Sequence, residues 1–231
     1  MQKLTSLLAA SLALGALTSY GQTVISQVPY QITRPGSYVL ENSLSFSEAG
    51  GHTNAIEIKA DNVTLDFAGH TLAHESGSQA GSGVLVDGTH LVTIKNGTVS
   101  NFHFGILLQS GGSNVVENMR VLGGNSVGID LSQQEGSIVQ NNFVNMSGQG
   151  QFGIACDAGS LSNHLLRNNV LGPVLGIFED DPGGNYLESN FVSNCSTGIT
   201  TGRNSKFRLN TTINCQTPFN GNGTPVGREN N

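Results

Sequence analysis

The sequence predicts an all-β fold, a right-handed parallel β-helix of about eight coils of 20–28 residues with an N-terminal cap. Three observations predict it. A small residue followed by an apolar one recurs at intervals of 22, 23, 25, 23 and 22 residues, the second half of each interval repeats as well, and Asn returns at one turn position. A fixed period in the twenties is typical of stacked supersecondary units.

The small-apolar pair marks the first strand of each coil. Ala55-Ile56 extends the series upstream and Pro218-Phe219 extends it downstream. Because side chains alternate along a strand, we expect the first and third residues after the small one to face inward, and the second and fourth outward. The central pairs are Gly83-Val84, Gly105-Ile106, Gly128-Ile129, Gly153-Ile154, Gly176-Ile177 and Gly198-Ile199.

The rest of each coil carries two more apolar columns with an Asn between them. We expect the Asn residues to adopt left-handed backbone geometry and to hydrogen-bond one another along the stack. Both halves of the coil are β-like, which distinguishes it from a leucine-rich repeat. The first column is Ile94, Val116, Val139, Leu165, Leu187 and Phe207, the second is Val99, Val121, Val144, Val170 and Val192, and the Asn column is Asn142, Asn168, Asn190 and Asn210.

The N-terminal residues 1–21 read as a signal peptide, with Lys3, a short apolar run and small residues before the cut. The run is shorter than the roughly 20 residues that span a bilayer, so we expect a secreted or periplasmic protein without a membrane span. Residues 22–54 are assigned to the N-terminal cap and first strands, 55–220 to the β-helix and 221–231 to a loose C-terminal tail. A weakly covered last coil could dock against another copy or a partner.

Charge and cysteine content narrow the class of protein further. The formal net charge of −6 disfavours nucleic-acid partners, which require clustered Lys and Arg. Cys195 and Cys215 occupy the same position in neighbouring coils, so their Cα atoms should lie about 4.8 Å apart, within the range of a disulfide. A disulfide and a reduced, stacked pair both fit this spacing, and Cys156 has no partner.

The segments "PGSYVL" (35–40) and "NAIEIKADNVTLDFAGHTL" (54–72), together with the Gly-Ile coils, resemble the right-handed β-helix repeat proteins of the pectin-lyase-like superfamily over about residues 30–220. The resemblance implies the fold, while the activities in that superfamily include lyases, hydrolases and epimerases. Of the polygalacturonase motifs only Asp180-Asp181 is present. The Asp-Pro-His-Glu motif of the alginate epimerases is reduced here to Asp181-Pro182, followed by two glycines.

Three carboxylates, Asp130, Asp157 and Asp180, are expected on one outer face, with Glu179 and Asp181 beside them. Carboxylates on adjacent coils would lie about 5 Å apart, and such a pair shares a proton or holds a cation. Calcium is therefore the candidate cofactor, with these three Asp residues as ligands. The alternative is a solvated acidic ledge.

The candidate catalytic residues are Asp157, Asp180 and Arg203. Arg203 follows Asp180 by one coil and could act as the base of a lyase, as the resemblance to pectate lyases implies. Phe143 and Phe191, at the outward position of the third strand and two coils apart, are candidate substrate-binding residues. They could equally pack beneath a loop.

The leading hypothesis is an exported, non-catalytic scaffold whose long face binds carbohydrate or another extracytoplasmic polymer, such as a cell-surface polymer. The alternative is a polysaccharide lyase or glycoside hydrolase that acts on a uronate-containing polysaccharide through the carboxylate face, with calcium. The sequence leaves open whether the protein is an enzyme.

Overall fold

The computed structural model describes residues 21–48, 53–76, 81–124, 126–146, 150–157, 159–180 and 182–226. These residues form strands joined by turns, and none of them is helical. Within the same ranges, accordingly, no helix exists that is long and apolar enough to cross a membrane. The expected signal peptide, residues 1–21, lies almost wholly outside the described residues.

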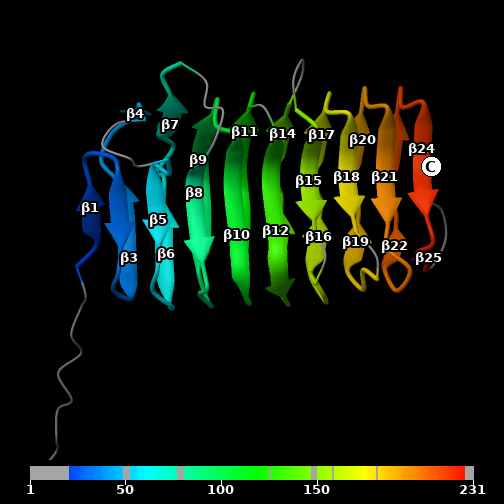
Figure 1. Cartoon of the computed structure of the whole chain (residues 1–231), viewed down its shortest axis with the longest axis horizontal. Coiled ribbons are helices and arrows are strands. Elements are labelled where there is room, and N and C mark those ends of the chain that lie inside the picture. Colours follow the sequence, from blue (N-terminus) through cyan, green and yellow to red (C-terminus); the bar gives the residue numbers. More distant parts are fainter. Residues whose placement is uncertain are drawn as a thin grey trace, which may run out of the picture.

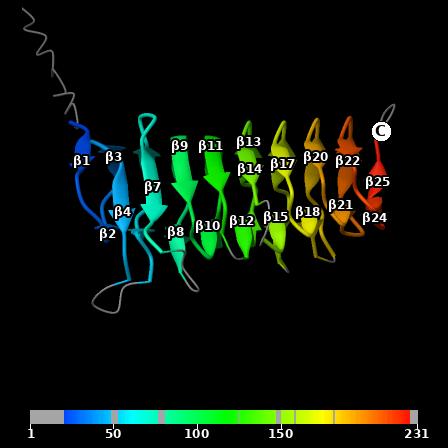
Figure 2. The same ribbon diagram turned by 90° about the horizontal axis from the view of Figure 1, so that it is seen from above.

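Two parallel sheets run the length of the molecule (Figures 1 and 2). The nine-stranded sheet takes one strand from each coil. In spatial order its strands are β2 (Tyr30–Ile32), β5 (Ile56–Ile58), β8 (Ser82–Asp87), β10 (Phe104–Gly112), β12 (Val127–Glu135), β15 (Phe152–Cys156), β18 (Leu175–Glu179), β21 (Thr197–Thr201) and β24 (Thr217–Gly221).

The 16-stranded sheet takes the other strands of the coils and folds around the remaining sides. One row in it is β1 (Thr23–Ile25), β3 (Gly36–Leu40), β6 (Val63–Asp66), β9 (Thr93–Ser100), β11 (Val115–Leu122), β13 (Ile138–Gln140), β16 (His164–Leu166), β19 (Tyr186–Glu188), β22 (Lys206–Arg208) and β25 (Thr224–Pro225). Beside this row lie β4 (Leu44–Phe46), β7 (Thr71–His74), β14 (Phe143–Asn145), β17 (Asn169–Leu171), β20 (Phe191–Ser193) and β23 (Thr211–Ile213), connected through the long strands β9 and β11.

The register of the coils confirms the predicted columns. Ile106 pairs with Val84 on one side and Ile129 on the other, and the same column continues to Phe219 in the last coil. The columns through Val116 and Val121 also stack as predicted. These inward side chains are fully buried in most coils and form one continuous core. The hydrophobic effect on this core is the main force that holds the coils together.

The Gly before each inward Ile or Val is required by space. At Gly105 an added Cβ would overlap the Val121 side chain and the backbone carbonyl of Gly128. At Gly128 it would overlap Val144 and the carbonyl of Gly153 in the same way. The Gly-Ile repeat therefore marks the corner where the backbone of each coil comes closest to its own core and to the next coil.

The Asn column forms the predicted ladder. Asn168, 1% exposed, donates from Nδ2 to the Val139 carbonyl at 2.9 Å and to Asn190 Oδ1 at 3.0 Å. Its own Oδ1 accepts from the backbone N–H and from Nδ2 of Asn142, at 3.1 and 3.0 Å. Asn210 continues the chain of bonds, so each buried amide is satisfied by the adjacent coils.

The expected left-handed geometry of these Asn residues is wrong by one position. The positive φ angles belong to the preceding residues, 55° at Asn141, 53° at Arg167, 56° at Ser189 and 54° at Leu209. The preceding residue makes the turn, which leaves the backbone N–H of the ladder Asn free to point along the stack. That N–H donates to the side chain of the next coil.

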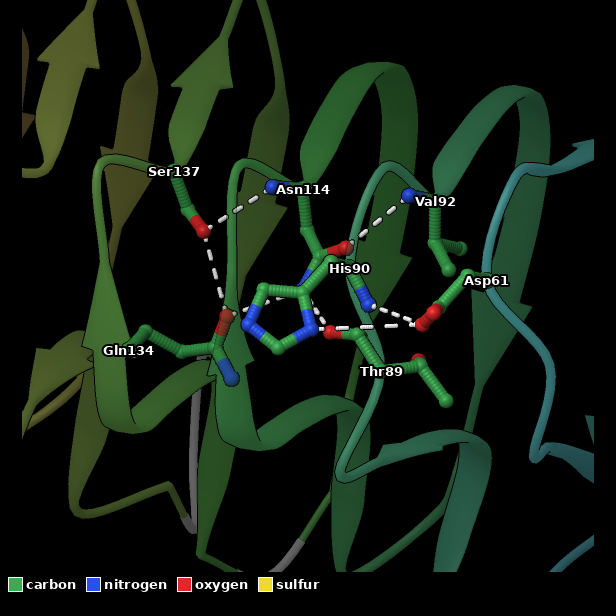
Figure 3. A network of polar contacts seen from close by, with 7 residues as sticks. All are labelled: Asp61, Thr89, His90, Val92, Asn114, Gln134 and Ser137. Carbon is green, nitrogen blue, oxygen red and sulfur yellow. Dashed lines mark hydrogen bonds and ion pairs between the residues drawn. The ribbon is translucent and has the colours of Figure 1, made fainter.

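A second ladder, made of Asn and Ser side chains, runs along another corner, and Figure 3 shows its first members. Asn114 Oδ1 accepts from the Val92 N–H at 2.9 Å, while its Nδ2 donates to the Thr89 carbonyl and to Gln134 Oε1. Ser137 Oγ accepts from the Asn114 N–H and donates to the same Gln134 oxygen. The ladder continues through Asn163, Asn185 and Ser205.

Both ends of the solenoid contain paired strands. Strands β1 to β4 pair in register with later strands, as expected for a segment 22–54 that holds the first strands, and the N-terminal cap stays a prediction. At the other end the tail expected from residue 221 is not wholly loose, because β25 pairs with β22. Residues 227–231 lie outside the described part of the chain.

We predict that Asn168→Ala destabilises the protein. The substitution removes the side-chain hydrogen bonds of Asn168 to the Val139 carbonyl and to Asn190 Oδ1, and it removes the acceptor of the Asn142 N–H, so we expect a loss of about 2–4 kcal/mol in the free energy of unfolding, measured by urea denaturation. Asn169→Ala is the control, because the exposed neighbouring side chain should change stability by less than about 0.5 kcal/mol. Equal losses in the two variants would contradict a structural role for the ladder.

Candidate functional site

The outer face of the nine-stranded sheet carries three rows of side chains that run along the solenoid axis. Two of the rows are mainly apolar and the third is polar, and each row takes one residue per coil. The first row is Phe104, Val127, Phe152, Leu175 and Thr197; the second is Leu85, Leu107, Asp130, Ala155, Phe178 and Thr200. The third begins with Asp87, Gln109 and Ser132 and continues with Asp157 and Asp180, which directly follow β15 and β18.

Most apolar side chains of the first two rows are half-buried. The Phe152 and Phe178 rings contact each other with centroids 5.1 Å apart and planes at 50°. They come from adjacent strands, β15 and β18, and one of them occupies each apolar row. The face thus presents aromatic and aliphatic surface beside carboxylates, a mixture found in sites that hold polar ligands with apolar faces.

Asp130 is the unusual member of the apolar rows. It stands in register between Leu107 and Ala155 and is only 4% exposed. Its Oδ1 has no hydrogen-bond partner among the described residues. Burial, followed by the charge of Asp157, raises the pKa of the Asp130 carboxyl from 3.8 to about 7.

Asp157 and Asp180 belong to the exposed polar row. Partial burial raises the pKa of Asp157, and the negative charge of Asp180 raises it further. Asp130 couples to Asp157 and Asp157 to Asp180, so the structure brings the three carboxyl groups into one electrostatic group. Asp130 does not fit the alternative of a solvated acidic ledge, because its side chain is buried.

This arrangement can hold and move a proton. With a pKa of about 7, Asp130 carries its proton in a large fraction of molecules at neutral pH. Asp157 is exposed, so burial opposes the ionisation of its carboxyl less than that of Asp130. A protonated carboxyl beside an ionised one is the pattern that general acid–base catalysis uses, and titration of such a pair is a property of both groups together.

Glu179 does not lie beside these carboxylates on the outer face, contrary to expectation. It pairs with Cys156, takes the third place after Gly176 and points inward, with 2% of its surface exposed. Burial raises the pKa of the Glu179 carboxyl, and the nearby polar side chains of Asn185 and Ser205 lower it by a smaller amount. Neither carboxylate oxygen has a hydrogen-bond partner among the described residues. Asp181, the other expected neighbour, lies outside the described residues.

Of the remaining candidate residues, Arg203 is exposed in the turn after β21, and the residue before it, Gly202, lies against the backbone of Asp180 in the previous coil. Phe143 and Phe191 belong to β14 and β20 of the other sheet, with Asn169 between them in the column. The Arg120 guanidinium lies 4.9 Å from the centre of the Phe143 ring, and Phe191 is 37% exposed. The two rings therefore share no face with the carboxylates.

The described residues contain no preformed metal site. In those ranges no group of three or more His, Cys, Asp or Glu side chains is arranged to hold a metal ion. A calcium site at Asp130, Asp157 and Asp180 stays a prediction, since it would require these side chains to rearrange around the ion.

Sequence reasoning missed two features of this face. The first is the apolar strip itself, in which Phe104 and Phe152 share one row with Val127 between them and Phe178 lies in the other row, so that no column of identical residues forms. The second is the burial of Asp130, which depends on the bulk of its neighbours. The outward position of Asp130 was predictable from strand alternation alone.

Comparison with protein families identifies the fold independently. The family model for a right handed beta helix region matches residues 36–174, more than half of the chain. No curated protein matches the sequence.

Several solved structures share the fold at low sequence identity. A pectate lyase, Pel9A, is 14% identical with a TM-score of 0.59, and the match covers 88% of this chain and 68% of the lyase. An alginate lyase from Paenibacillus sp. strain FPU-7 is 13% identical with a TM-score of 0.52 and coverages of 74% and 70%. A double mutant of a periplasmic alginate epimerase is 12% identical with a TM-score of 0.51, and the match covers 86% of this chain and 47% of the epimerase.

These likenesses show the architecture, and the family match shows the hand of the coil. Identities of 12–14% show nothing of the substrate. The family match over more than half of the chain, together with the register of the strands, establishes that this chain belongs to the right handed beta helix family.

Proposed function

We propose that the protein binds an extended carbohydrate polymer along the outer face of the nine-stranded sheet. The observation that carries the proposal is the strip of half-buried apolar side chains, including Phe152 and Phe178, that runs beside Asp130, Asp157 and Asp180. Sugar rings have apolar C–H faces and polar rims, so aromatic rings and carboxylates match them together. The polysaccharide-acting names of the solved structures with this fold support the same substrate class.

The geometry of the face favours a long ligand over a compact one. Equivalent residues repeat once per coil, about 4.8 Å apart, along nearly the whole solenoid. A polymer of repeating units can make the same contact on successive coils, which gains affinity without a deep pocket.

The negative charge of the face restricts which polymers can bind in the absence of a bridging cation. Carboxylates on the row and a formal net charge of −6 repel a polyanion such as a polyuronate. We therefore propose a neutral polysaccharide as the ligand, with binding of uronate polymers only where calcium bridges the two sets of carboxylates. Such calcium-dependent binding would place the ion at Asp157 and Asp180.

Affinity electrophoresis against neutral and uronate polysaccharides, with and without calcium, tests this proposal. We expect Phe178→Ala to weaken binding of the polymer about tenfold, a loss of about 1.4 kcal/mol, because it removes one stacking surface. Phe191→Ala is the matched control, since the same side chain is removed from the other sheet. A loss of binding in Phe191→Ala with none in Phe178→Ala would move the site to the Phe143 and Phe191 face.

A catalytic role is the second candidate, and the buried Asp130 beside Asp157 favours it. Asp130 could donate a proton to a leaving oxygen while Asp157 accepts one or stabilises positive charge at the sugar ring. We expect any release of reducing ends or unsaturated products to fall at least about 100-fold in Asp130→Asn and in Asp157→Asn. Asp87→Asn, in the same polar row, should keep the activity. Absence of products from every polymer that binds would leave the protein a non-catalytic binder.

The buried carboxyl also predicts how stability depends on pH. Because the pKa of Asp130 is raised to about 7 in the folded protein, the fold favours the protonated form, and its contribution is complete below about pH 4 and lost as the pH rises towards 7. Asp130→Asn should therefore raise the free energy of unfolding at about pH 8, by up to about 4 kcal/mol, and change it little at about pH 4. Urea denaturation at both pH values measures this difference. A stabilisation that is the same at the two pH values would contradict the buried, protonated carboxyl.

A further inference from the structure

Cys195 and Cys215 lie on adjacent coils near the C-terminal end of the solenoid. The residues on both sides of them are paired in register, Ser193 with Ile213 and Thr197 with Thr217. The cysteines fall at the same place between these pairs, so their Cα atoms are separated by one coil spacing, about 4.8 Å. That value lies inside the 4.4–6.8 Å range that a disulfide spans without moving the backbone.

The two thiols are reduced, and they differ in exposure. Cys195 is 5% exposed and donates to the Ser193 carbonyl at 3.2 Å, whereas Cys215 is partly exposed and donates to the Ile213 carbonyl at 3.5 Å. Burial, and then the neighbouring Cys215 thiol, raises the pKa of Cys195 to about 12. The third thiol, Cys156, is buried in the core at the end of β15 and pairs in register with Leu131 and Glu179.

An open groove borders Cys195, and the two chain neighbours of Cys215, Asn214 and Gln216, also line it. Its volume is about 520 Å³, and Cys195 forms part of its wall. The rest of the wall is polar or backbone-rich, with Asn194, Ser196, Asn214 and Gln216 among its residues and Pro173 and Val174 as its apolar part. A reagent with amide and carboxylate groups, such as a small peptide disulfide, matches such a surface.

We propose that Cys195 and Cys215 form a thiol–disulfide exchange site that takes a peptide-like disulfide as its substrate and becomes an intrachain disulfide between adjacent coils. The proposed polymer-binding face does not require this site, because the cysteines lie outside the nine-stranded sheet, in the connections from β20 to β21 and from β23 to β24.

The reaction proceeds in two exchanges. The thiolate of Cys215, the more exposed residue, attacks one sulfur of the reagent, forms a mixed disulfide and releases the first thiol. Cys195 then loses its proton to solvent and attacks the Cys215 sulfur, which breaks the mixed disulfide and releases the second thiol. In sum, two protein thiols are oxidised by two electrons, and one reagent disulfide is reduced to two thiols. Because burial disfavours the Cys195 thiolate, the second exchange should be the slower one and should speed up as the pH rises.

The position of the bond gives it a structural consequence. Among the described residues, β23 and β24 each pair with a single strand, β20 and β21. The last coil therefore lacks the support that inner coils receive from both sides. A Cys195–Cys215 bond would fasten this coil to the one before it and reduce its local opening.

Incubation of the full-length protein with oxidised glutathione at mildly alkaline pH, followed by intact mass and tryptic peptide mapping, tests the proposal. The expected product has lost two hydrogen atoms, about 2 Da, with no glutathione retained. Trypsin cuts the connecting chain after Arg203, Lys206 and Arg208, so peptides 168–203 and 209–228 should stay joined until a reductant is added. Hydrogen exchange at the Thr217 amide, which donates to the Ser196 carbonyl, should be slower in this product than in the reduced protein.

Two variants make the outcome specific. Cys156→Ser should react as the parent does, whereas Cys215→Ser should show neither the mass loss nor the slower exchange. The proposal is overturned by a stable glutathione adduct on Cys215, by a bond that includes Cys156, by intermolecular dimers in place of the intrachain bond, or by two unreacted thiols. Loss of polymer binding in the Phe178→Ala variant leaves this test unaffected, because it reads sulfur chemistry alone.

Discussion

In-register stacking of the coils is the constraint on which the rest of the structure depends. Each coil repeats the backbone path of the previous one, so a buried side chain meets its own equivalent about 4.8 Å away. The inward Ile and Val residues pack closely against their equivalents in the neighbouring coils. The Asn ladders form hydrogen bonds to the coils on either side. A single slip of register would expose the core residues and leave the amides of several Asn residues unsatisfied at once.

The same stacking turns outward residues into rows, and the rows create the candidate site. On most of the solenoid the outer positions carry side chains that tolerate a like neighbour, such as Leu beside Leu. Asp130 breaks this rule, because it places a carboxyl between Leu107 and Ala155 with one oxygen unpartnered. Burial of such a group costs free energy that the fold alone does not recover. A carboxyl group that is buried at such a cost is therefore expected to have a function, either in binding a ligand or in a reaction that uses its proton.

The parts of the structure that sequence reasoning predicted are those in which one residue type repeats. The Gly-Ile corner and the Asn142–Asn210 column are strict repeats, and both stack as predicted. The Asn114 ladder was missed because Ser137 and Ser205 substitute for Asn in it, while intervals of 23, 26, 22 and 20 residues would have revealed it. The inward direction of Glu179 follows from strand alternation. The burial of Asp130 depends on the size of the neighbouring side chains, which the repeat pattern does not predict.

The most direct measurement of the central claim is a crystal structure of the protein soaked with oligosaccharides of a polymer that it binds. The account predicts sugar rings lying along the outer face of the nine-stranded sheet, with one ring against Phe152 and Phe178 and hydroxyl groups within hydrogen-bond distance of Asp130 or Asp157. Sugar bound over Phe143 and Phe191, or only at an end of the solenoid, would contradict it.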